Sequence, residues 1–413
     1  MNLTVSLNKV HQNFILFWTV IFAGRFFFHV AISSLGLSFL FFKLTTFFSL
    51  LFLAILGFQL FLSKWKLLFL LDKVLICGGM IFVLFGVLTF DYIFLQMAFL
   101  IFFSQYFLCF LFKGDYYRIR VFYVFLAVLV SFEIIMQFFL FNNHLFGFDG
   151  WYLDADDYVA YRSLFTDLNE VFSDSRPAGG ILRVDGVFGY NHTTGAYLAV
   201  AAAFIFEYVK KNKINLFPFF ICVLGVFAST STTAIIALFA SMFISIIWDS
   251  KIKFYARVSM FVFFILIVLG FLFSHLGDYI LNRLIGNLAS SSYVYAFIPS
   301  FSGEGDMLRY FIGFNRSHSY IAESDIMAII ANYGILFVLL FFTRFAIVYI
   351  DVFKAQKTGL DLTFYSASAT AVMSGMICLL HTSATLTWQV GSVVFLFLGV
   401  LIKRYYLVRN VNL

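Results

Sequence analysis

Charged residues are scarce in this chain. Asp, Glu, Lys and Arg together make up 12% of its 413 residues, whereas 62% are hydrophobic. Apolar runs of about 20 residues, the length that crosses a bilayer as a helix, recur along the whole sequence. The strands of a membrane β-barrel would alternate apolar and polar residues instead. The composition therefore predicts an all-α polytopic membrane protein.

Cysteine is also scarce, and its positions exclude two kinds of site. All four cysteines lie inside predicted membrane spans, at Cys77, Cys109, Cys222 and Cys378. The external loops therefore carry no disulfide, although an oxidising compartment would permit one. No two cysteines have the spacing of metal ligands.

Other absences narrow the function. The sequence has no P-loop, no Rossmann glycine fingerprint and no cytoplasmic domain. It has no internal repeat, which gives an inverted-repeat transporter little support. The first apolar stretch follows Lys9 without a small-residue cleavage site, so we expect a signal anchor. Any substrate must then arrive through the membrane or from outside.

Apolar runs predict twelve membrane spans, with ends placed to within several residues. They cover about residues 14–31, 45–62, 74–90, 92–112, 121–142, 186–209, 214–230, 232–248, 255–274, 325–347, 362–381 and 385–402.

The distribution of charge predicts the orientation of these spans. The net charge is +6, and the basic residues fall in alternate loops, which places both termini in the cytoplasm. Thirteen of the fourteen lysines lie on the predicted cytoplasmic side. The basic character therefore reflects topology, and no nucleic-acid partner is expected.

The predicted external side carries arginine and histidine instead of lysine. Arginine offers a rigid fork for two anionic oxygens, which lysine lacks. The external arginines are Arg25, Arg162, Arg176, Arg183, Arg283, Arg309 and Arg316, and six of the seven histidines lie at or beyond the outer helix ends. We therefore expect the polar chemistry to be external.

Two external loops are long, within what we expect to be a single membrane domain over residues 1–413. They cover about residues 143–185 and 275–324, and loops of such length are usually functional or disordered. Their many aromatic residues argue against disorder. We expect them to fold onto the membrane domain.

The first candidate site is "RVDGVFGYNHTTGAYLAV" (residues 183–200), which ends the first long loop and begins the sixth span. Arg183 is expected above the helix, with Asn191 and His192 about two turns further in. Polar residues at membrane depth usually face a water-filled cavity or the bundle interior. The alternative is an ordinary polar helix start, with Arg183 extending to the lipid headgroups.

The second candidate site is "RYFIGFNRSHSYIAESD" (residues 309–325), which closes the second long loop. Arg309 and Arg316 can hold a phosphate or pyrophosphate through bidentate hydrogen bonds. His318 between them can take a proton from a hydroxyl near neutral pH. Alternatively, Glu323 and Asp325 favour a helix N-terminus and pair with Arg316.

Three weaker signals leave alternatives open. "DADD" (residues 154–157) contains an Asp-x-Asp that can hold a divalent cation, although a solvated surface is the favoured interpretation. The hydroxyls of "ASTSTTA" (residues 228–234) either satisfy helix ends or line a sugar site. Glu133 and Arg25 are charges inside spans that need partners, with proton relay as their functional alternative.

With these residues in view, the chain resembles the Wzy-type O-antigen or capsule polymerases, which are related to the O-antigen ligases among the C-type glycosyltransferases. The resemblance rests on many spans with two long periplasmic loops, and on two motifs. They are "RVDGVFGYN" and "ESDIMAIIANYGI" (residues 323–335), and Tyr190 stands where such proteins commonly carry proline.

The resemblance implies an enzyme of lipopolysaccharide and polysaccharide biosynthesis in the bacterial inner membrane. It would transfer a growing glycan from undecaprenyl pyrophosphate to a lipid-linked repeat unit on the periplasmic face. The implied partners are undecaprenyl-pyrophosphate-linked oligosaccharides, inner-membrane lipids and a chain-length regulator protein. No cofactor and no metal is expected if arginines supply the positive charge.

The resemblance also suggests roles for the candidate residues. Arg183 and Arg316 would stabilise the departing pyrophosphate, and His318 would deprotonate or orient the acceptor hydroxyl. The remaining candidates are expected to bind substrate: Arg176, Arg309, Asn191, His192, Tyr190, Glu323 and Asp325. An O-antigen ligase and a lipid-linked oligosaccharide flippase are the alternatives.

Overall fold

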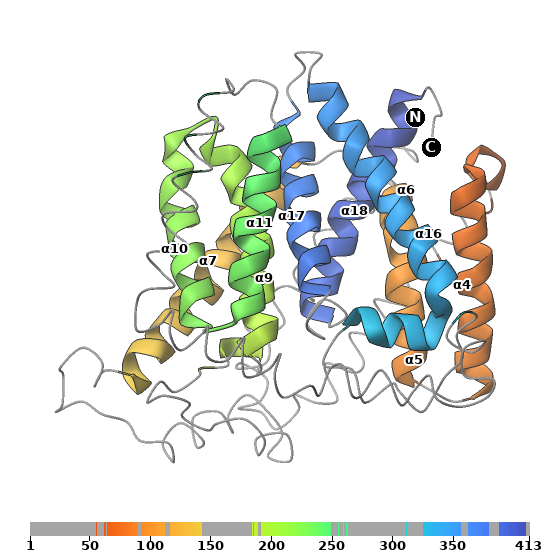
Figure 1. Ribbon diagram of the computed structural model, residues 1–413, viewed down its shortest axis with the longest axis horizontal. Coiled ribbons are helices and arrows are strands. Elements are labelled where there is room, and N and C mark those ends of the chain that lie inside the picture. Colours follow the sequence, from red (N-terminus) through yellow and green to blue (C-terminus); the bar gives the residue numbers. More distant parts are fainter. Residues whose placement is uncertain are drawn as a thin grey trace, which may run out of the picture.

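The computed structural model (Figure 1) describes residues 64–89, 92–111, 116–142, 186–188, 191–248, 325–356, 362–379 and 388–409, with single positions elsewhere. All regular elements in these ranges are helices. The long ones are α4 (Leu70–Leu88), α5 (Tyr92–Ala98), α6 (Gln105–Leu111), α7 (Tyr116–Phe141), α9 (Asn191–Val209), α10 (Leu216–Ala228), α11 (Thr232–Trp248), α16 (Asp325–Gln356), α17 (Thr363–Leu379) and α18 (Trp388–Val408).

Four of these helices are long and apolar enough to cross a membrane. They are α4, α7, residues Asn332–Val352 of α16 and residues Gln389–Val408 of α18. For the described residues, the prediction of an all-helical chain with several membrane-spanning helices is therefore confirmed.

The predicted spans can be compared with the helices wherever the chain is described. The span expected at 14–31 lies outside the described residues, and so do the spans at 45–62 and 255–274 and both long loops except for single positions. Each of the other predicted spans falls on described helix. The total of twelve crossings stays a prediction.

Side-chain contacts bring alternate helix ends together. The N–H of Phe69, just before α4, donates to the Tyr406 hydroxyl near the end of α18 at 2.9 Å. The hydroxyls of Tyr116 and Tyr365 join the starts of α7 and α17. Arg120 of α7 donates to Asn215, which precedes α10, at 2.8 Å.

We call this end of the bundle the basic end, because the described lysines and most described arginines gather there. These residues are Lys64, Lys66, Lys73, Arg118, Arg120, Lys210, Lys211, Lys213, Lys403, Arg404 and Arg409. The positive-inside pattern predicts that this end faces the cytoplasm. In Figure 1 it is uppermost, and α9 begins at the opposite end.

Small residues build the centre of the bundle. α9 packs against α7, α10, α11, α17 and α18, and every residue from Thr193 to Ile205 is buried. α9 and α17 are rich in alanine, serine and glycine, whose small side chains let helix backbones approach closely. Such close packing stabilises helix association in a membrane, where the hydrophobic effect does not drive helices together. The large lipid-facing side chains therefore lie on the outer helices, such as Leu84 of α4 and Phe125 of α7.

The predicted span at 325–347 differs from the helix found there. α16 begins at Asp325 as expected, but Gly334 has φ 80° and ψ 152°, which breaks the helical geometry. Such backbone angles are essentially restricted to glycine. The residues before Gly334 run across the other helices (Figure 1), and the membrane-crossing part covers Asn332–Val352. The crossing therefore starts about two turns later than predicted.

Contacts with α5 hold the bent part of α16. Tyr333 donates its hydroxyl proton to the carbonyl of Phe94 at 2.7 Å. Its ring packs against the rings of Phe82 and Phe94, each 5.0 Å away between centroids. This buried aromatic contact fixes the position at which α16 turns.

The predicted span at 92–112 is also irregular. Between α5 and α6 the residues Phe99–Ser104 form a π-helix, an element often found where a helix must be distorted for packing or function. Ser104 and Gln105 donate to the carbonyls of Leu100 and Ile101, each at 2.5 Å. These side chains satisfy backbone groups in a setting where water cannot.

Candidate functional site

The structure describes only part of the site predicted from the sequence. Asn191 and His192 are described in full, and Asp325 is placed as the first residue of α16. The other candidates lie outside the described residues: Arg176, Arg183, Tyr190, Arg309, Arg316, His318 and Glu323. The arginine clamp and the role of His318 therefore stay predictions.

Asn191 and His192 form the first turn of α9, at the end opposite the basic end. Asn191 is buried, with 7% of its surface exposed, and its Oδ1 accepts the backbone N–H of His192 at 2.8 Å. His192 is partly buried, and its Nδ1 lies 3.2 Å from the hydroxyl oxygen of Ser231. The start of α9 is thus joined to the turn between α10 and α11.

That turn contains the serines and threonines of "ASTSTTA". The hydroxyl of Ser229 donates to the carbonyl of Val226 at 2.6 Å and accepts the N–H of Ser231 at 3.3 Å. The hydroxyl of Ser231 accepts the N–H of Ala234 at 3.4 Å, which caps α11. Of the two interpretations left open, the structure shows the satisfaction of helix ends, with His192 as an added partner of Ser231.

Two backbone features let this turn reach α9. Thr230 has φ 52°, a left-handed conformation that is unusual for a β-branched residue. A Cβ on Gly195 would lie 2.6 Å from the Ser229 hydroxyl oxygen and 2.8 Å from Cβ of Ser231. The glycine is therefore required for the close approach that brings Ser231 to His192.

Glu133 lies on α7, which packs against α9, and the sequence alone indicated no partner for it. Its carboxylate accepts from the side-chain amide of Gln137, one turn later on α7. The amide oxygen of Gln137 in turn accepts the N–H of Gly186 at 3.2 Å. Gly186 has φ 64° and packs against Thr194. Glu133 therefore helps to position the segment that leads into the first turn of α9.

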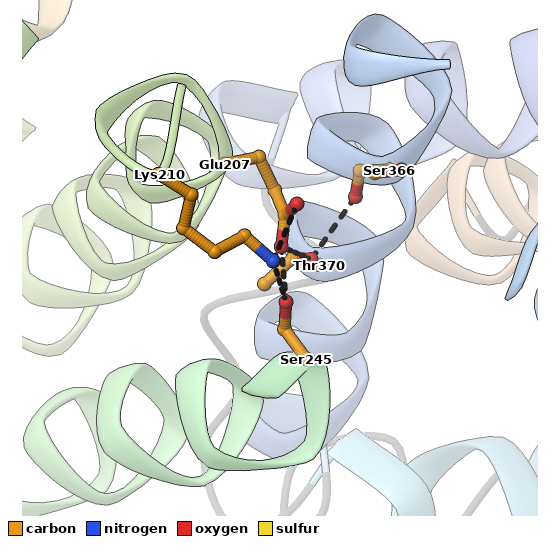
Figure 2. A network of polar contacts seen from close by, with 5 residues as sticks. All are labelled: Glu207, Lys210, Ser245, Ser366 and Thr370. Atoms are coloured by element: carbon orange, nitrogen blue, oxygen red, sulfur yellow. Dashed lines mark hydrogen bonds and ion pairs between the residues drawn. The ribbon is translucent and has the colours of Figure 1, made fainter. Parts of the chain in front are cut away.

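Sequence reasoning missed a polar cluster at the basic end (Figure 2). Glu207 of α9 is 3% exposed, and its carboxylate pairs with Lys210 at 2.8 Å. It also accepts from the hydroxyl of Ser245 on α11, and from Thr370 on α17 at 3.0 Å. Lys210 reaches Ser245 at 3.0 Å, so its ammonium group lies between that hydroxyl and the carboxylate.

A second cluster at the same end surrounds Asp72 of α4, which is fully buried. One carboxylate oxygen lies 2.5 Å from Nε of Arg344 on α16 and accepts from Tyr106 of α6 at 2.7 Å. The other oxygen accepts from Tyr406 of α18. One buried carboxylate thus joins four helices.

The sequence does contain a sign of the Glu207 and Asp72 clusters, which is a charged residue inside a predicted span. Glu207 lies in the predicted span 186–209 and Arg344 in the predicted span 325–347, and a charge inside a span calls for an internal partner. The expectation that the functional polar chemistry is external stays a prediction. Within the described ranges, buried ion pairs gather at the predicted cytoplasmic end.

The described residues contain no group of three or more His, Cys, Asp or Glu side chains placed to hold a metal ion. All four cysteines carry free thiols. "DADD" lies outside the described residues.

Comparison with known protein families, with curated proteins and with solved structures found no match to this chain.

Proposed function

We propose that this protein is a membrane glycosyltransferase of the Wzy type, which polymerises O-antigen or capsule repeat units at the periplasmic face of the bacterial inner membrane. The observation that carries the proposal is the first turn of α9. It combines Asn191 and His192 with a helix N-terminus, at the end of the bundle opposite the basic end.

This turn has the chemistry that an anionic headgroup requires. The N-terminus of a helix carries a partial positive charge and favours phosphate groups. The Oδ1 atom of Asn191 accepts the backbone N–H of His192, and the side-chain amide and the imidazole both carry N–H groups of the kind that bind phosphate oxygens. A lipid pyrophosphate emerging from the bilayer would meet hydrogen-bond donors here.

The reaction exchanges one bond to the anomeric carbon for another. The acceptor sugar hydroxyl of the lipid-linked repeat unit attacks the anomeric carbon of the growing glycan. The bond from that carbon to the pyrophosphate oxygen breaks, and undecaprenyl pyrophosphate leaves. The hydroxyl proton passes to a base, for which His318 is the candidate, and Arg183, Arg309 and Arg316 would stabilise the departing charge.

Deletion of the gene, followed by gel analysis of the surface polysaccharide, tests the proposal. Loss of a polymerase leaves lipid A core capped by a single repeat unit. Loss of a ligase leaves bare core with polymer stranded on undecaprenyl pyrophosphate, and loss of a flippase exports nothing. Bare core or absent export would contradict the proposal, and complementation with the intact gene is the control.

One observation favours a transporter, such as a lipid-linked oligosaccharide flippase, more than the sequence did. Asp72, Glu207 and Arg344 are charges buried inside helices, and such residues often mark a transport pathway. They form compact pairs near the basic end, whereas a pathway needs polar groups from one end to the other. A cysteine-accessibility scan that finds positions open alternately to both sides would favour the transporter.

A further inference from the structure

Cations and aromatic rings form a continuous surface where α4 begins and α18 ends. Nζ of Lys73 lies 5.8 Å from the ring centre of Trp65. The guanidinium carbon of Arg409 lies 4.5 Å from the ring centre of Tyr405 and 5.8 Å from that of Phe69. The rings of Phe69 and Tyr405 are 5.5 Å apart between centroids, and Lys73 follows Phe69 by one helical turn. We call these five residues the α4–α18 patch.

Hydrogen bonds fix the backbone beneath the patch. The N–H of Leu68 donates to the carbonyl of Trp65 at 3.2 Å and closes the short turn before α4. The N–H of Phe69 donates to the Tyr406 hydroxyl at 2.9 Å, and this hydroxyl donates in turn to Asp72. The start of α4 and the end of α18 are therefore held together, which keeps the two cations of the patch close to each other.

The accessible charge of the patch is positive. Lys73 is half-buried, whereas Arg409 and the neighbouring Lys66 are exposed. The adjacent carboxylate, Asp72, is fully buried and pairs with Arg344 at 2.5 Å, so this pair adds no net charge. Within the described ranges, the charged groups of Lys73 and Arg409 contact aromatic rings, which attract a cation without neutralising its charge. The patch therefore favours an anion.

An exposed apolar stripe continues from the patch along α4. Leu70, Val74, Ile81 and Leu84 are spaced by three, four and seven residues, and their exposed fractions run from 41% for Val74 to 78% for Leu70. Lys73 lies three residues after Leu70, so it shares this side of the helix. α4 stands at the outer edge of the bundle (Figure 1). A cation at one end of an apolar stripe matches a phospholipid, which has a phosphate headgroup and apolar chains.

We propose that the α4–α18 patch binds an anionic phospholipid of the surrounding membrane. The guanidinium of Arg409 donates to two phosphate oxygens, and the ammonium of Lys73 attracts the same phosphate as a point charge. The acyl chains lie along the stripe of α4. Trp65 lies at the depth of the headgroups, where tryptophan is enriched. A zwitterionic phospholipid has no net charge and gains less from the two cations. This inference is independent of the proposed function.

Quenching of Trp65 fluorescence by brominated lipids tests the site directly. The intact protein is reconstituted into phosphatidylcholine vesicles that contain brominated phosphatidylglycerol or brominated phosphatidylcholine. Subtracting the signal of the Trp65→Phe variant isolates the fluorescence of Trp65. We expect half-maximal quenching of Trp65 at a lower mole fraction of the anionic lipid. Equal quenching by the two brominated lipids would overturn the inference.

Removal of the two cations tests their role in this preference. Each basic residue near a membrane surface contributes about fivefold to the binding of an anionic lipid, so Lys73→Gln with Arg409→Gln should bring the two lipids towards equal binding. The matched control is Lys211→Gln with Lys213→Gln, which removes two exposed cations from another part of the basic end and should leave the preference unchanged. An unchanged preference in the Lys73 and Arg409 variant, or an equal loss in the control, would contradict the patch.

Inorganic phosphate distinguishes a lipid site from a site for a free anion. Phosphate and chloride at equal ionic strength screen the membrane charge equally. We therefore expect the two salts to have the same effect on the quenching of Trp65 by brominated phosphatidylglycerol. Displacement of this lipid by phosphate but not by chloride would show a site for free phosphate and would overturn the assignment to a membrane lipid.

Discussion

At the scale of single residues, substitutions of the predicted pyrophosphate-binding arginines can distinguish the effect of their charge from the effect of their hydrogen-bond geometry. Lysine keeps the positive charge of arginine but loses the rigid fork that binds two oxygens. Replacing Arg183 or Arg316 by Lys should therefore reduce polymerisation nearly as much as replacement by Ala. The loss of one charge-assisted contact in a site of low dielectric constant is worth about 3 kcal/mol, on the order of a hundredfold in rate.

The measurement is the polymer ladder of a complemented deletion strain, with the protein level in the membrane checked by immunoblot. Arg162→Lys is the control, because Arg162 lies among acidic residues of the first loop and a surface ion pair contributes at most about 1 kcal/mol. If Arg183→Lys and Arg316→Lys both give unchanged ladders, these arginines are interfacial anchors.

The acidic residues of the first long loop allow a test of metal dependence. Because arginine is expected to supply the positive charge, polymer formation by the purified protein should continue in EDTA. The quantity measured is polymer formed with and without the chelator. Loss of activity that Mg²⁺ or Mn²⁺ restores would instead indicate that Asp154 and Asp156 hold a cation.

At the scale of helices, the Glu207 cluster ties α9 to α11 and α17 through charge. Lys210→Met should leave a buried carboxylate without its counter-charge and destabilise the protein by about 3–5 kcal/mol. Replacing both residues, as Lys210→Met with Glu207→Leu, removes the uncompensated charge and should restore much of the lost stability. Thermal unfolding in detergent measures both effects.

The neighbouring Lys211 provides the matched control for this cluster. It is exposed and follows Lys210 directly, so Lys211→Met should change the free energy of unfolding by less than about 0.5 kcal/mol. A Lys210→Met variant as stable as Lys211→Met would show that the buried pair contributes nothing to folding.

The bend in α16 gives a second prediction for a helix. Gly334→Ala places a Cβ at φ 80° and ψ 152°, which should cost about 1–3 kcal/mol or straighten the helix. Gly86→Ala in α4 is the control, since Gly86 has ordinary helical geometry and its new Cβ would need only a small shift of its neighbours, which lie 3.2 Å away at the Phe94 ring and 3.3 Å away at Cβ of Leu95. Equal melting temperatures for the two variants would contradict a fixed bend at Gly334.

These helices also show how far the sequence could be interpreted. The length of each apolar run predicts a helix well, because backbone groups in lipid must bond within their own segment. The bend at Gly334 could not be predicted, since it depends on the contact of Tyr333 with Phe94, 239 positions away in the chain. The charge of Glu207 was visible inside a span, but its partners Ser245 and Thr370 lie on other helices that no sequence pattern joins to it.

At the scale of the whole molecule, one set of contacts determines which segments share a side of the membrane. Phe69 and Tyr406 join the start of α4 to the end of α18, and the Glu207 cluster joins the end of α9 to Thr370 in the first half of α17. These are segments that the positive-inside pattern also predicts on one side. These contacts hold the basic end together on one side of the membrane. The start of α9, at the opposite end of the bundle, must then lie on the other side.

Reporter fusions decide that orientation. Fusions near Lys211 and Lys354 should be cytoplasmic, and fusions near Asp156 and Glu304, in the two long loops, should be periplasmic. Alkaline phosphatase and green fluorescent protein at the same positions provide opposite readouts and so control for expression. A cytoplasmic result for either long loop would put His192 and the predicted arginines on the side where no lipid-linked repeat unit is polymerised. The proposed function would then fail together with the predicted topology.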